Sequence, residues 1–320
     1  MNPKTARIST TAQDSPWSAA DVPRLDGRVA VITGANTGIG FETARVLAER
    51  GAQVVLACRS VERARAAAAR IAASTDADAA PETLELDLAS LSSVRRAAEQ
   101  LHDLHPGIDL LINNAGVMDV PYGTTEDGFE SHLGINHLGH FALTGLLLPQ
   151  LTQAEGSRII SISSVVHARG QIDFEDLAYT RDYKPGPAYS RSKLANLLFA
   201  FELDRRLTAA GSAAASLAAH PGLSRTELYR YEEPVARIAV RLLSPVLMQS
   251  AASGALPVLR AATDTAAAGG TYYGPSGRKQ YKGQPVVVDA APAAHDEAAA
   301  RRLWDESEKL TGVIFPRSSP

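Results

Sequence analysis

A tyrosine and a lysine four residues apart, Tyr189 and Lys193, form the pair in this sequence that is best suited to proton transfer. Residues at i and i+4 lie on one face of a helix. A free phenol has a pKa near 10 and is a poor acid or base at neutral pH, but a nearby ammonium group favours the phenolate and lowers that pKa. The spacing therefore indicates acid–base chemistry, with a solvated pair on a helix surface as the alternative.

A serine, Ser164, is the candidate third member of this site. It follows the apolar run Arg158–Ser163, which has the composition of a strand, and α/β proteins bind ligands at the carboxyl ends of their strands. The hydroxyl could there donate a hydrogen bond to a substrate oxygen. Because successive side chains of a strand point to opposite faces, only one of Ser163 and Ser164 is expected to face the site.

A glycine-rich turn, TGANTGIG at 33–40, follows the β-branched run Arg28–Thr33 and precedes a run of helix formers. Glycines in such a turn allow a tight bend, a close approach of the backbone to a pyrophosphate, and close contact between helix and strand. The helix that begins near Ile39 would direct free N–H groups and the positive end of its dipole at a phosphate. The pattern predicts a dinucleotide site, with a turn that binds nothing as the alternative.

The residues after the second apolar run favour one nicotinamide cofactor over the other. An NAD enzyme of this kind carries an acid at the end of its second strand, where it binds the ribose 2′-hydroxyl. Here that position is Cys58, and Arg59 follows it. A guanidinium suits the bidentate recognition of a phosphate, with Ser60 and Arg63 as further donors. The sequence therefore predicts NADP(H) rather than NAD(H), unless Arg59 is simply a surface residue.

Apolar runs alternate with helical patterns along the chain, which predicts a parallel sheet with helices on both faces. The expected strands are Arg28–Thr33, Gln53–Cys58, Thr83–Leu88, Leu110–Asn113, Arg158–Ser163, Ser212–Ala219 and one near Pro285–Val288. The expected helices are Ile39–Arg50, Val61 to about Ala73, Ser90–Leu104, Asp127–Leu151, Ala188–Leu207 and Ser250–Ala262. No linker rich in proline or glycine divides the sequence. We therefore expect a single-domain, Rossmann-like, doubly wound parallel α/β fold over residues 21–320, preceded by a mobile arm, residues 1–20.

Composition excludes several classes of protein. The 320-residue chain has a formal net charge of -3 and no block of like charges, so we expect no nucleic-acid or anionic-membrane partner. The single cysteine, Cys58, rules out an intramolecular disulfide and a cysteine cluster for zinc, and we expect no metal. No apolar run is long enough for a transmembrane helix, and the N-terminus lacks the apolar core of a signal peptide. These features predict a cytoplasmic protein without an integral membrane segment.

Six motifs, taken together, resemble the short-chain dehydrogenase/reductase family. They are TGANTGIG (33–40), LDL (86–88), NNAG (113–116), Asn136, the Tyr189 and Lys193 pair, and HPG (220–222) with Thr226, in family order across roughly residues 26–290. Four stretches resemble the retinol-dehydrogenase and WW-domain-oxidoreductase-like branch: VVLACRS (54–60), INHLGHF (135–141), SSVVH (163–167) and LWDESEKLTGV (303–313). We expect neither the N-terminal membrane anchor of many animal retinol dehydrogenases nor WW repeats.

The resemblance implies a role for each of four catalytic residues. Tyr189 would exchange a proton with the substrate oxygen, and Ser164 would hydrogen-bond that oxygen. Lys193 would lower the pKa of Tyr189 and hold the nicotinamide ribose. Asn136 would join Lys193 in a water-linked proton relay, with a surface polar residue as the alternative.

The resemblance also implies a set of cofactor contacts. They are Gly34, Asn36, Thr37, Gly38, Ile39, Gly40, Arg59, Ser60, Asp87, Leu88, Asn114, Ala115, Gly116, Tyr189, Lys193, Pro221, Gly222, Leu223 and Thr226. Within this set, Asp87 is assigned to the adenine, the small residues after Asn113 to the adenosine ribose, and Leu223 and Thr226 to the nicotinamide carboxamide. Asp87 and Thr226 each have a helix-capping role as the alternative.

The function implied is an NADP(H)-dependent transfer of hydride between the nicotinamide and a carbonyl or alcohol of a lipophilic small molecule. The alternative is a non-catalytic NADP(H)-binding sensor or interaction protein on the same fold, which would not need the four catalytic residues. Two segments are expected on the substrate side. Gln171–Pro187 would cover the entrance, and Glu227–Gln249 would form a lid, with core or a subunit contact in a homo-oligomer as its alternatives.

Overall fold

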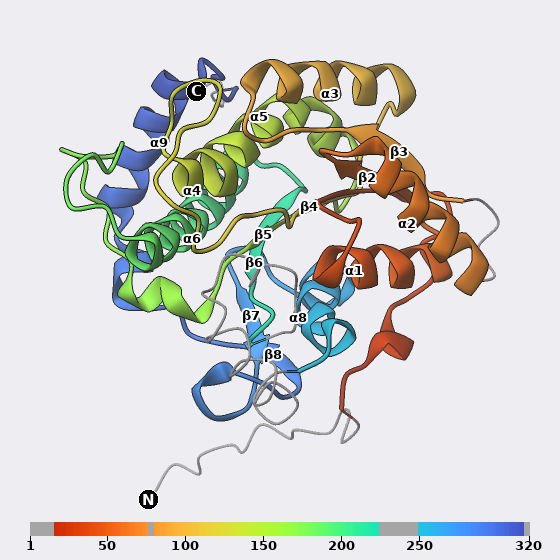
Figure 1. Ribbon diagram of the computed structural model, residues 1–320. Helices are drawn as coiled ribbons and strands as arrows, with labels where there is room; N and C mark the ends of the chain where they lie inside the picture. Colours follow the sequence, from red (N-terminus) through yellow and green to blue (C-terminus); the bar gives the residue numbers. More distant parts are fainter. Residues whose placement is uncertain (1–15, 76–79, 224–248, 317–320) are drawn as a thin grey trace, which may run out of the picture.

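Eight strands form one sheet between two layers of helices in the computed structural model, which describes residues 16–75, 80–223 and 249–316 (Figure 1). The strands are β1 (Val29–Thr33), β2 (Gln53–Cys58), β3 (Glu82–Glu85), β4 (Leu110–Asn113), β5 (Arg158–Ile162), β6 (Ala215–Ala219), β7 (Tyr272–Pro275) and β8 (Pro285–Val287). Their order is β3-β2-β1-β4-β5-β6-β7-β8, and each neighbouring pair is parallel except β7 and β8.

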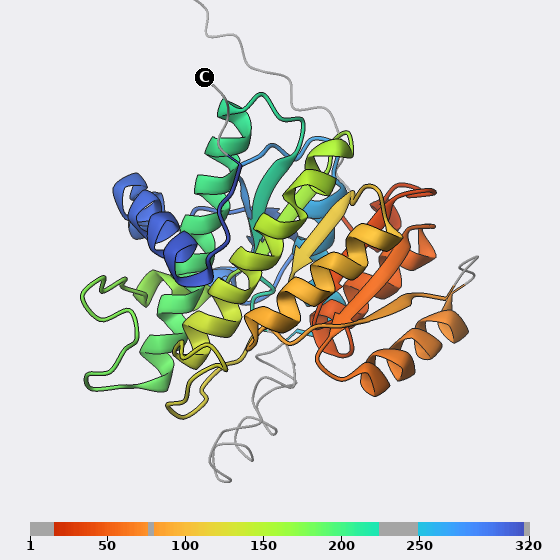
Figure 2. The ribbon, with the colours of Figure 1, turned by 90° about the horizontal axis from the view of Figure 1, so that it is seen from above.

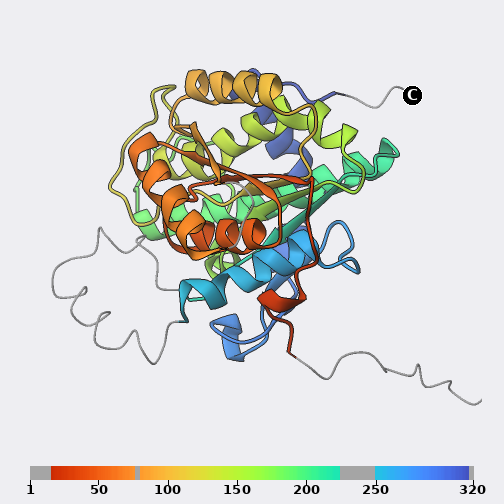
Figure 3. The same cartoon turned by 90° about the vertical axis from the view of Figure 1, so that its right-hand side faces the viewer.

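Helices cover both faces of the sheet, which is why its strands are almost continuously apolar. On one face lie α1 (Gly38–Glu49), α2 (Val61–Ser74) and α8 (Ala251–Thr263). On the other lie α3 (Leu91–Leu104), α5 (Gly139–Gln153), α6 (Pro185–Ala209) and α9 (Glu297–Thr311). Figure 3 shows the sheet from the side, with α3 and α5 above it and α8 below. The Rossmann-like, doubly wound fold predicted from the sequence is confirmed.

The chain changes direction across the sheet between β1 and β4. From β1 it winds outward through β2 to β3, and then returns to add β4 on the other side of β1. Ligands of open α/β sheets bind at such a switch point, outside the carboxyl ends of the strands. The glycine-rich turn follows β1, and the 113–116 motif follows β4, so both lie at this point.

Several elements differ from those expected. The long helical pattern over 127–151 divides into α4 (Ser131–Leu133), a π-helical turn (Gly134–Leu138) and α5. The third strand ends at Glu85 because Asp87 and Ala89 enter a turn closed by the Asp87 carboxylate. The strand β7 and the helix α9 were not expected, and β8 is antiparallel to its neighbour.

The structure describes the end of the predicted N-terminal arm, but of the predicted lid it describes only Gln249. Ser18 caps a short 3-10 helix, Ala19–Asp21, and Trp17 packs against the α1 side of the core. Thr226 and residues 227–248 of the expected lid lie outside the described residues. Within the parts that the structure describes, we find no helix of the length and apolar character needed to cross a bilayer.

Candidate active site

The turn after β1 lies against the loop after β4. Gly34 has a φ of +65°, where residues other than glycine are strained, and a Cβ there would lie 2.9 Å from Ala115 Cβ. A Cβ on Gly40 would lie 2.5 Å from Asn114 Nδ2. Within the described residues, Thr37 makes no side-chain capping bond to α1, so the first N–H groups of this helix keep no such partner. The turn offers the close backbone approach and the donors that a pyrophosphate needs.

A hydroxyl and an imidazole fix the loop after β4. Thr33 Oγ1 accepts hydrogen bonds from the N–H groups of Asn114 and Ala115, both at 2.9 Å, and lies 2.9 Å from His140 Nε2. His140 Nδ1 donates to the Asn136 carbonyl at 3.0 Å. Since a carbonyl only accepts, Nδ1 carries the proton, and Nε2 accepts from Thr33. Burial lowers the pKa of His140 to about 4, so the ring is neutral at physiological pH.

The helix α6 presents Tyr189 and Lys193 at the carboxyl end of β5. Both are buried, and Lys193 Nζ donates to the carbonyl of Ile162 at 3.1 Å. The ammonium lies 5.6 Å from the centre of the Tyr189 ring. Burial lowers the pKa of Lys193 to about 8. A cation therefore sits beside the phenol, as acid–base chemistry requires.

Asn136 joins the loop after β4 to α6. It lies in the π-helical turn, an irregularity that often marks functional sites. Its Nδ2 donates to the Val117 carbonyl at 3.0 Å and to Ser192 Oγ at 2.9 Å, and its Oδ1 accepts from Val117 N–H at 2.8 Å. A Cβ on Gly116 would lie 3.0 Å from Asn136 Oδ1 and 3.5 Å from Lys193 Nζ. Because Gly116 has no side chain, both Asn136 and Lys193 can approach the loop after β4 closely.

The two neighbouring serines after β5 have different surroundings. Ser163 is 2% exposed, and its hydroxyl donates to the Lys193 carbonyl at 2.8 Å. Ser164 is half-buried and caps the 3-10 turn Val165–Arg169. Its carbonyl accepts from His167 Nδ1 at 2.7 Å, while His167 Nε2 accepts from the Ala291 N–H at 3.0 Å. These contacts favour Ser164 as the hydroxyl available to a substrate.

These residues meet around one cavity of about 440 Å³, within the usual range for small-molecule sites. Three catalytic candidates line it, Ser164, Tyr189 and Lys193. The residues from the cofactor set that line it are Ile39, Asn114, Gly116, Pro221, Gly222 and Leu223. The remaining wall carries the apolar side chains of Met118, Ile162, Val165, Val166 and Pro187, together with the charged residues Asp119 and Arg169. The cavity therefore joins the expected nucleotide edge to the acid–base pair.

Comparison with known proteins identifies the family. The sequence model described as short chain dehydrogenase matches residues 28–234. The chain belongs to the short-chain dehydrogenase family. This short-chain dehydrogenase is 44% identical to human retinol dehydrogenase 13 over 306 residues, which cover 93% of this chain and 88% of that protein. It is 43% identical to mouse polyprenol dehydrogenase over 298 residues, covering 91% and 86%. The resemblance to the retinol-dehydrogenase-like branch is confirmed.

Solved structures place the short-chain dehydrogenase in the same fold family. A crystal structure of an uncharacterized protein from Mycobacterium paratuberculosis is 46% identical, has a TM-score of 0.79, and covers 94% of this chain and 100% of its own. The complex of Pseudomonas aeruginosa RhlG with NADP is 26% identical, has a TM-score of 0.61, and covers 78% and 94%.

The remaining predicted cofactor residues of the short-chain dehydrogenase that the structure describes are not among those that line the cavity. Gly34, Asn36, Thr37, Gly38 and Gly40 form the turn after β1, and Ala115 lies against it. Arg59 is exposed after β2, and Ser60 caps α2 by accepting from Arg63 N–H while donating to Glu62. Asp87 accepts from the Ala89 N–H at 2.9 Å, and Leu88 is buried. Asp87 thus closes a turn before α3, but Ser90 and not Asp87 is the N-cap of that helix, and the adenine contact of Asp87 stays a prediction.

The loop after β6 reaches the cavity with part of its backbone already paired. Leu223 N–H donates to the Tyr281 carbonyl, and the Leu223 carbonyl accepts from the Gln249 N–H, both at 2.8 Å. Gly222 has a φ of +63°, and a Cβ there would clash with the Tyr281 carbonyl oxygen. A carboxamide contact from Leu223 stays a prediction, and Thr226 lies outside the described residues.

Sequence reasoning missed the side chains that hold the site together. Thr33 and His140 were not singled out, although His140 lies four residues after Asn136 and so shares its helix face. Glu130 and Arg191 were also missed. Both are buried charges, and a charge that interrupts an apolar helix face is the signal that could have found Arg191.

We expect Gly40→Ala to weaken NADPH binding by at least about tenfold, because the added Cβ would clash with the Gly34 carbonyl oxygen at 2.8 Å and force the turn to shift. Quenching of intrinsic fluorescence on titration with NADPH measures the affinity. Gly107→Ala is the matched control, since a Cβ there would make only ordinary contact, 3.7 Å from Ala154 Cβ, and Gly107 is not among the residues that line the cavity in the described chain. Equal affinities for the two variants would contradict the role of this close approach.

Proposed function

We propose that this short-chain dehydrogenase is an NADP(H)-dependent oxidoreductase that interconverts a carbonyl group and an alcohol on a lipophilic small molecule. One observation carries the proposal. Tyr189, Lys193 and Ser164 line the same cavity as Ile39 and Asn114, which lie at the switch point of the sheet. A binding protein needs the nucleotide side of this cavity, but not an acid–base pair on the other.

The residues present fit a nicotinamide dinucleotide. The turn after β1 and the first turn of α1 would hold the pyrophosphate, and the close approach at Gly34 leaves no room for a side chain there. Lys193, beside Gly116, would hold the nicotinamide ribose. When bound, the nicotinamide supplies the hydride for reduction or accepts it in oxidation.

Residues of this chain would bind the substrate oxygen and exchange a proton with it. In reduction, the Tyr189 hydroxyl donates its proton to the carbonyl oxygen while the carbonyl carbon receives the hydride, which gives the alcohol. Ser164 donates a hydrogen bond to the same oxygen. Lys193 stabilises the phenolate that remains. Oxidation runs through the same groups in reverse, with Tyr189 as the base.

Two observations support a lipophilic substrate. The wall of the cavity away from the nucleotide edge carries the apolar side chains of Met118, Val165, Val166 and Pro187, with the charged residues Asp119 and Arg169 also in the lining. The relatives named above are a retinol dehydrogenase and a polyprenol dehydrogenase, whose names refer to long apolar alcohols. The loss of NADPH absorbance with a series of aldehydes from short to long chains tests the proposal. NADPH binding without turnover on any of them would instead favour the non-catalytic alternative.

We expect Arg59→Ala to raise the KM for NADPH by about 10- to 150-fold and to leave the KM for NADH nearly unchanged, because a charge-assisted hydrogen bond to the 2′-phosphate contributes roughly 1.5–3 kcal/mol. Ser60 cannot easily replace the arginine, since its hydroxyl already donates to Glu62. Steady-state kinetics with both cofactors measure the ratio.

Arg301→Ala on α9, another exposed arginine, serves as the control. A wild-type protein that prefers NADH would show that Arg59 is only a surface residue and that the assignment of NADP(H) is wrong.

A further inference from the structure

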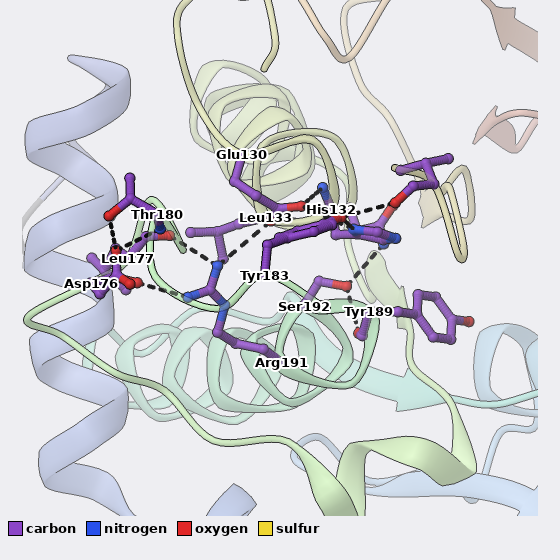
Figure 4. Close-up of polar contacts among 12 residues, drawn as sticks. Glu130, His132, Leu133, Asp176, Leu177, Thr180, Tyr183, Tyr189, Arg191 and Ser192 are labelled. Carbon is purple, nitrogen blue, oxygen red and sulfur yellow. Dashed lines mark hydrogen bonds and ion pairs between the residues drawn. The ribbon is translucent and has the colours of Figure 1, made fainter. Parts of the chain in front are cut away.

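Behind the catalytic pair, α6 carries a buried arginine. Arg191 lies between Tyr189 and Lys193 in sequence, but its side chain points away from Tyr189 (Figure 4). It is 4% exposed. Its Nη1 donates to the Asp176 carbonyl at 2.9 Å, and its Nη2 donates to the Leu177 carbonyl at 3.0 Å. The guanidinium thus joins the helix of the catalytic pair to the segment that precedes it.

The partner of this cation is a fully buried carboxylate. Glu130 Oε2 lies 3.6 Å from Arg191 Nη2, and the Glu130 side chain is 0% exposed. Glu130 also accepts from the N–H groups of His132 and Leu133 and from His132 Nδ1, at 2.8 to 2.9 Å. Burial alone would raise the pKa of Glu130, but the hydrogen bonds from His132 and Leu133 outweigh it and lower the pKa. The carboxylate is therefore an anion at neutral pH.

The segment that Arg191 holds is strained. Tyr179 and Asp182 have φ values of +50° and +49°, a region that costs free energy for residues other than glycine. The Asp176 carboxylate closes this turn by accepting from Thr180 N–H and Oγ1, at 2.9 and 3.0 Å. The Arg191 guanidinium also lies 4.6 Å from the centre of the Tyr179 ring. Such a conformation persists only where surrounding contacts hold it.

The held segment in turn supports the substrate side of the cavity. Tyr183 donates to the Val120 carbonyl at 2.9 Å, and its ring packs edge-on against Tyr122 at 5.2 Å. Two residues just before Val120, Met118 and Asp119, line the cavity. On the other side, the segment leads into Gly186 and Pro187, which also line it. The contacts of Arg191 therefore reach two stretches of the wall away from the nucleotide edge.

We propose that Glu130 and Arg191 are positioning residues for substrate selectivity, which hold the apolar wall of the cavity through the strained 176–183 segment. The proposal rests on the proposed function in taking the ligand of this wall to be a long apolar carbonyl compound. In the described part of the chain, neither residue of the pair makes a hydrogen bond or an ion pair to the turn after β1. The pair should therefore act on the binding of long substrates and not on the cofactor.

The test compares Arg191→Lys with Arg205→Lys, the same change further along α6, where the half-buried Arg205 pairs with Glu202, a buried carboxylate that Arg206 also contacts. A lysine keeps the charge but lacks the planar fork that reaches two carbonyls and Glu130 at once. We expect Arg191→Lys to raise the KM for decanal by about tenfold. The KM for butanal, the Kd of NADPH from fluorescence and all values for Arg205→Lys should stay near those of the wild type.

Hydrogen exchange in the free protein provides a readout that does not depend on turnover. Amides of 176–183 should exchange faster in Arg191→Lys than in the wild type, while those of α6 around Tyr189 keep their protection. Glu130→Gln keeps the capping oxygen but removes the charge. It should also increase the exchange rate of the 176–183 amides. It serves as the second variant if Arg191→Lys folds poorly.

Two outcomes would overturn the proposal. If the KM values for decanal and butanal and the Kd of NADPH change together, the pair only stabilises the fold. If exchange of 176–183 does not change in either variant, the pair does not hold the segment. A wild-type protein that reduces no aldehyde refutes the proposed function, and the exchange and NADPH results then still decide whether the pair acts on this wall.

Discussion

Replacement of Tyr189 by phenylalanine is expected to lower kcat for carbonyl reduction by about 10²- to 10⁴-fold or more, the usual contribution of a positioned general acid. Only the hydroxyl is removed, and the ring keeps its place beside Lys193, at 5.6 Å from the ammonium. NADPH affinity should therefore remain close to the wild-type value. Steady-state kinetics and a fluorescence titration with NADPH measure the two quantities separately.

Tyr273→Phe is the control for this experiment. Tyr273 is a buried tyrosine on β7 and is not among the residues that line the cavity in the described chain. Its variant should keep wild-type kcat. Near wild-type turnover in Tyr189→Phe would refute the proposed acid, and Ser164 would then be the next candidate.

Lys193→Ala should harm both turnover and cofactor affinity. Loss of the ammonium removes the charge that stabilises the phenolate of Tyr189, and we expect kcat to fall by about 10²-fold or more. It also removes the group placed beside Gly116 for the nicotinamide ribose, so the Kd of NADPH should rise, unlike that of Tyr189→Phe. A variant that loses turnover but binds NADPH as the wild type does would limit Lys193 to tuning the tyrosine.

The wild-type pH profile provides an independent check on Lys193. Burial lowers its pKa to about 8, so its positive charge is present at neutral pH and is lost as the pH rises through about 8. The rate of carbonyl reduction should fall over the same range, because the phenolate left by proton donation then lacks its neighbouring cation. A rate that does not change well above pH 8 would show that burial does not lower the pKa of Lys193 to about 8.

The candidate catalytic residues Ser164, Tyr189 and Lys193 could be brought to one cavity from the sequence because each one carries a local signal. Tyr189 and Lys193 share a helix face, Ser164 follows a strand, and the turn at 33–40 carries its glycines between a strand and a helix. Each of these signals can be recognised from residues that are close together in the sequence. The alternation of apolar runs and helical patterns likewise predicted the sheet and most of its helices, with bounds that differ by a few residues.

The contacts that hold the site could not be predicted in this way, because they join residues far apart in sequence. Thr33 meets His140, and Glu130 meets Arg191, only after the strands and helices have packed. Segment 171–187 was expected at the entrance from its length alone. The sequence carried no sign that Arg191 would hold it. The helix α9 was missed because its apolar positions are sparse among charged residues.

The late position of α9 in the chain bears on the order in which the protein folds during synthesis. Trp304 of α9 packs against Phe199 of α6 and Phe141 of α5, with ring centres 5.8 and 5.2 Å apart, and α9 runs alongside α6 (Figure 2). About a hundred residues separate the end of α6 from the end of α9, which take roughly 5–20 s to translate. During that interval the outer face of the helix that carries Tyr189 and Lys193 is uncovered, and its aromatic side chains are exposed. A nascent chain would thus complete the packing behind α6 only when α9 has left the ribosome.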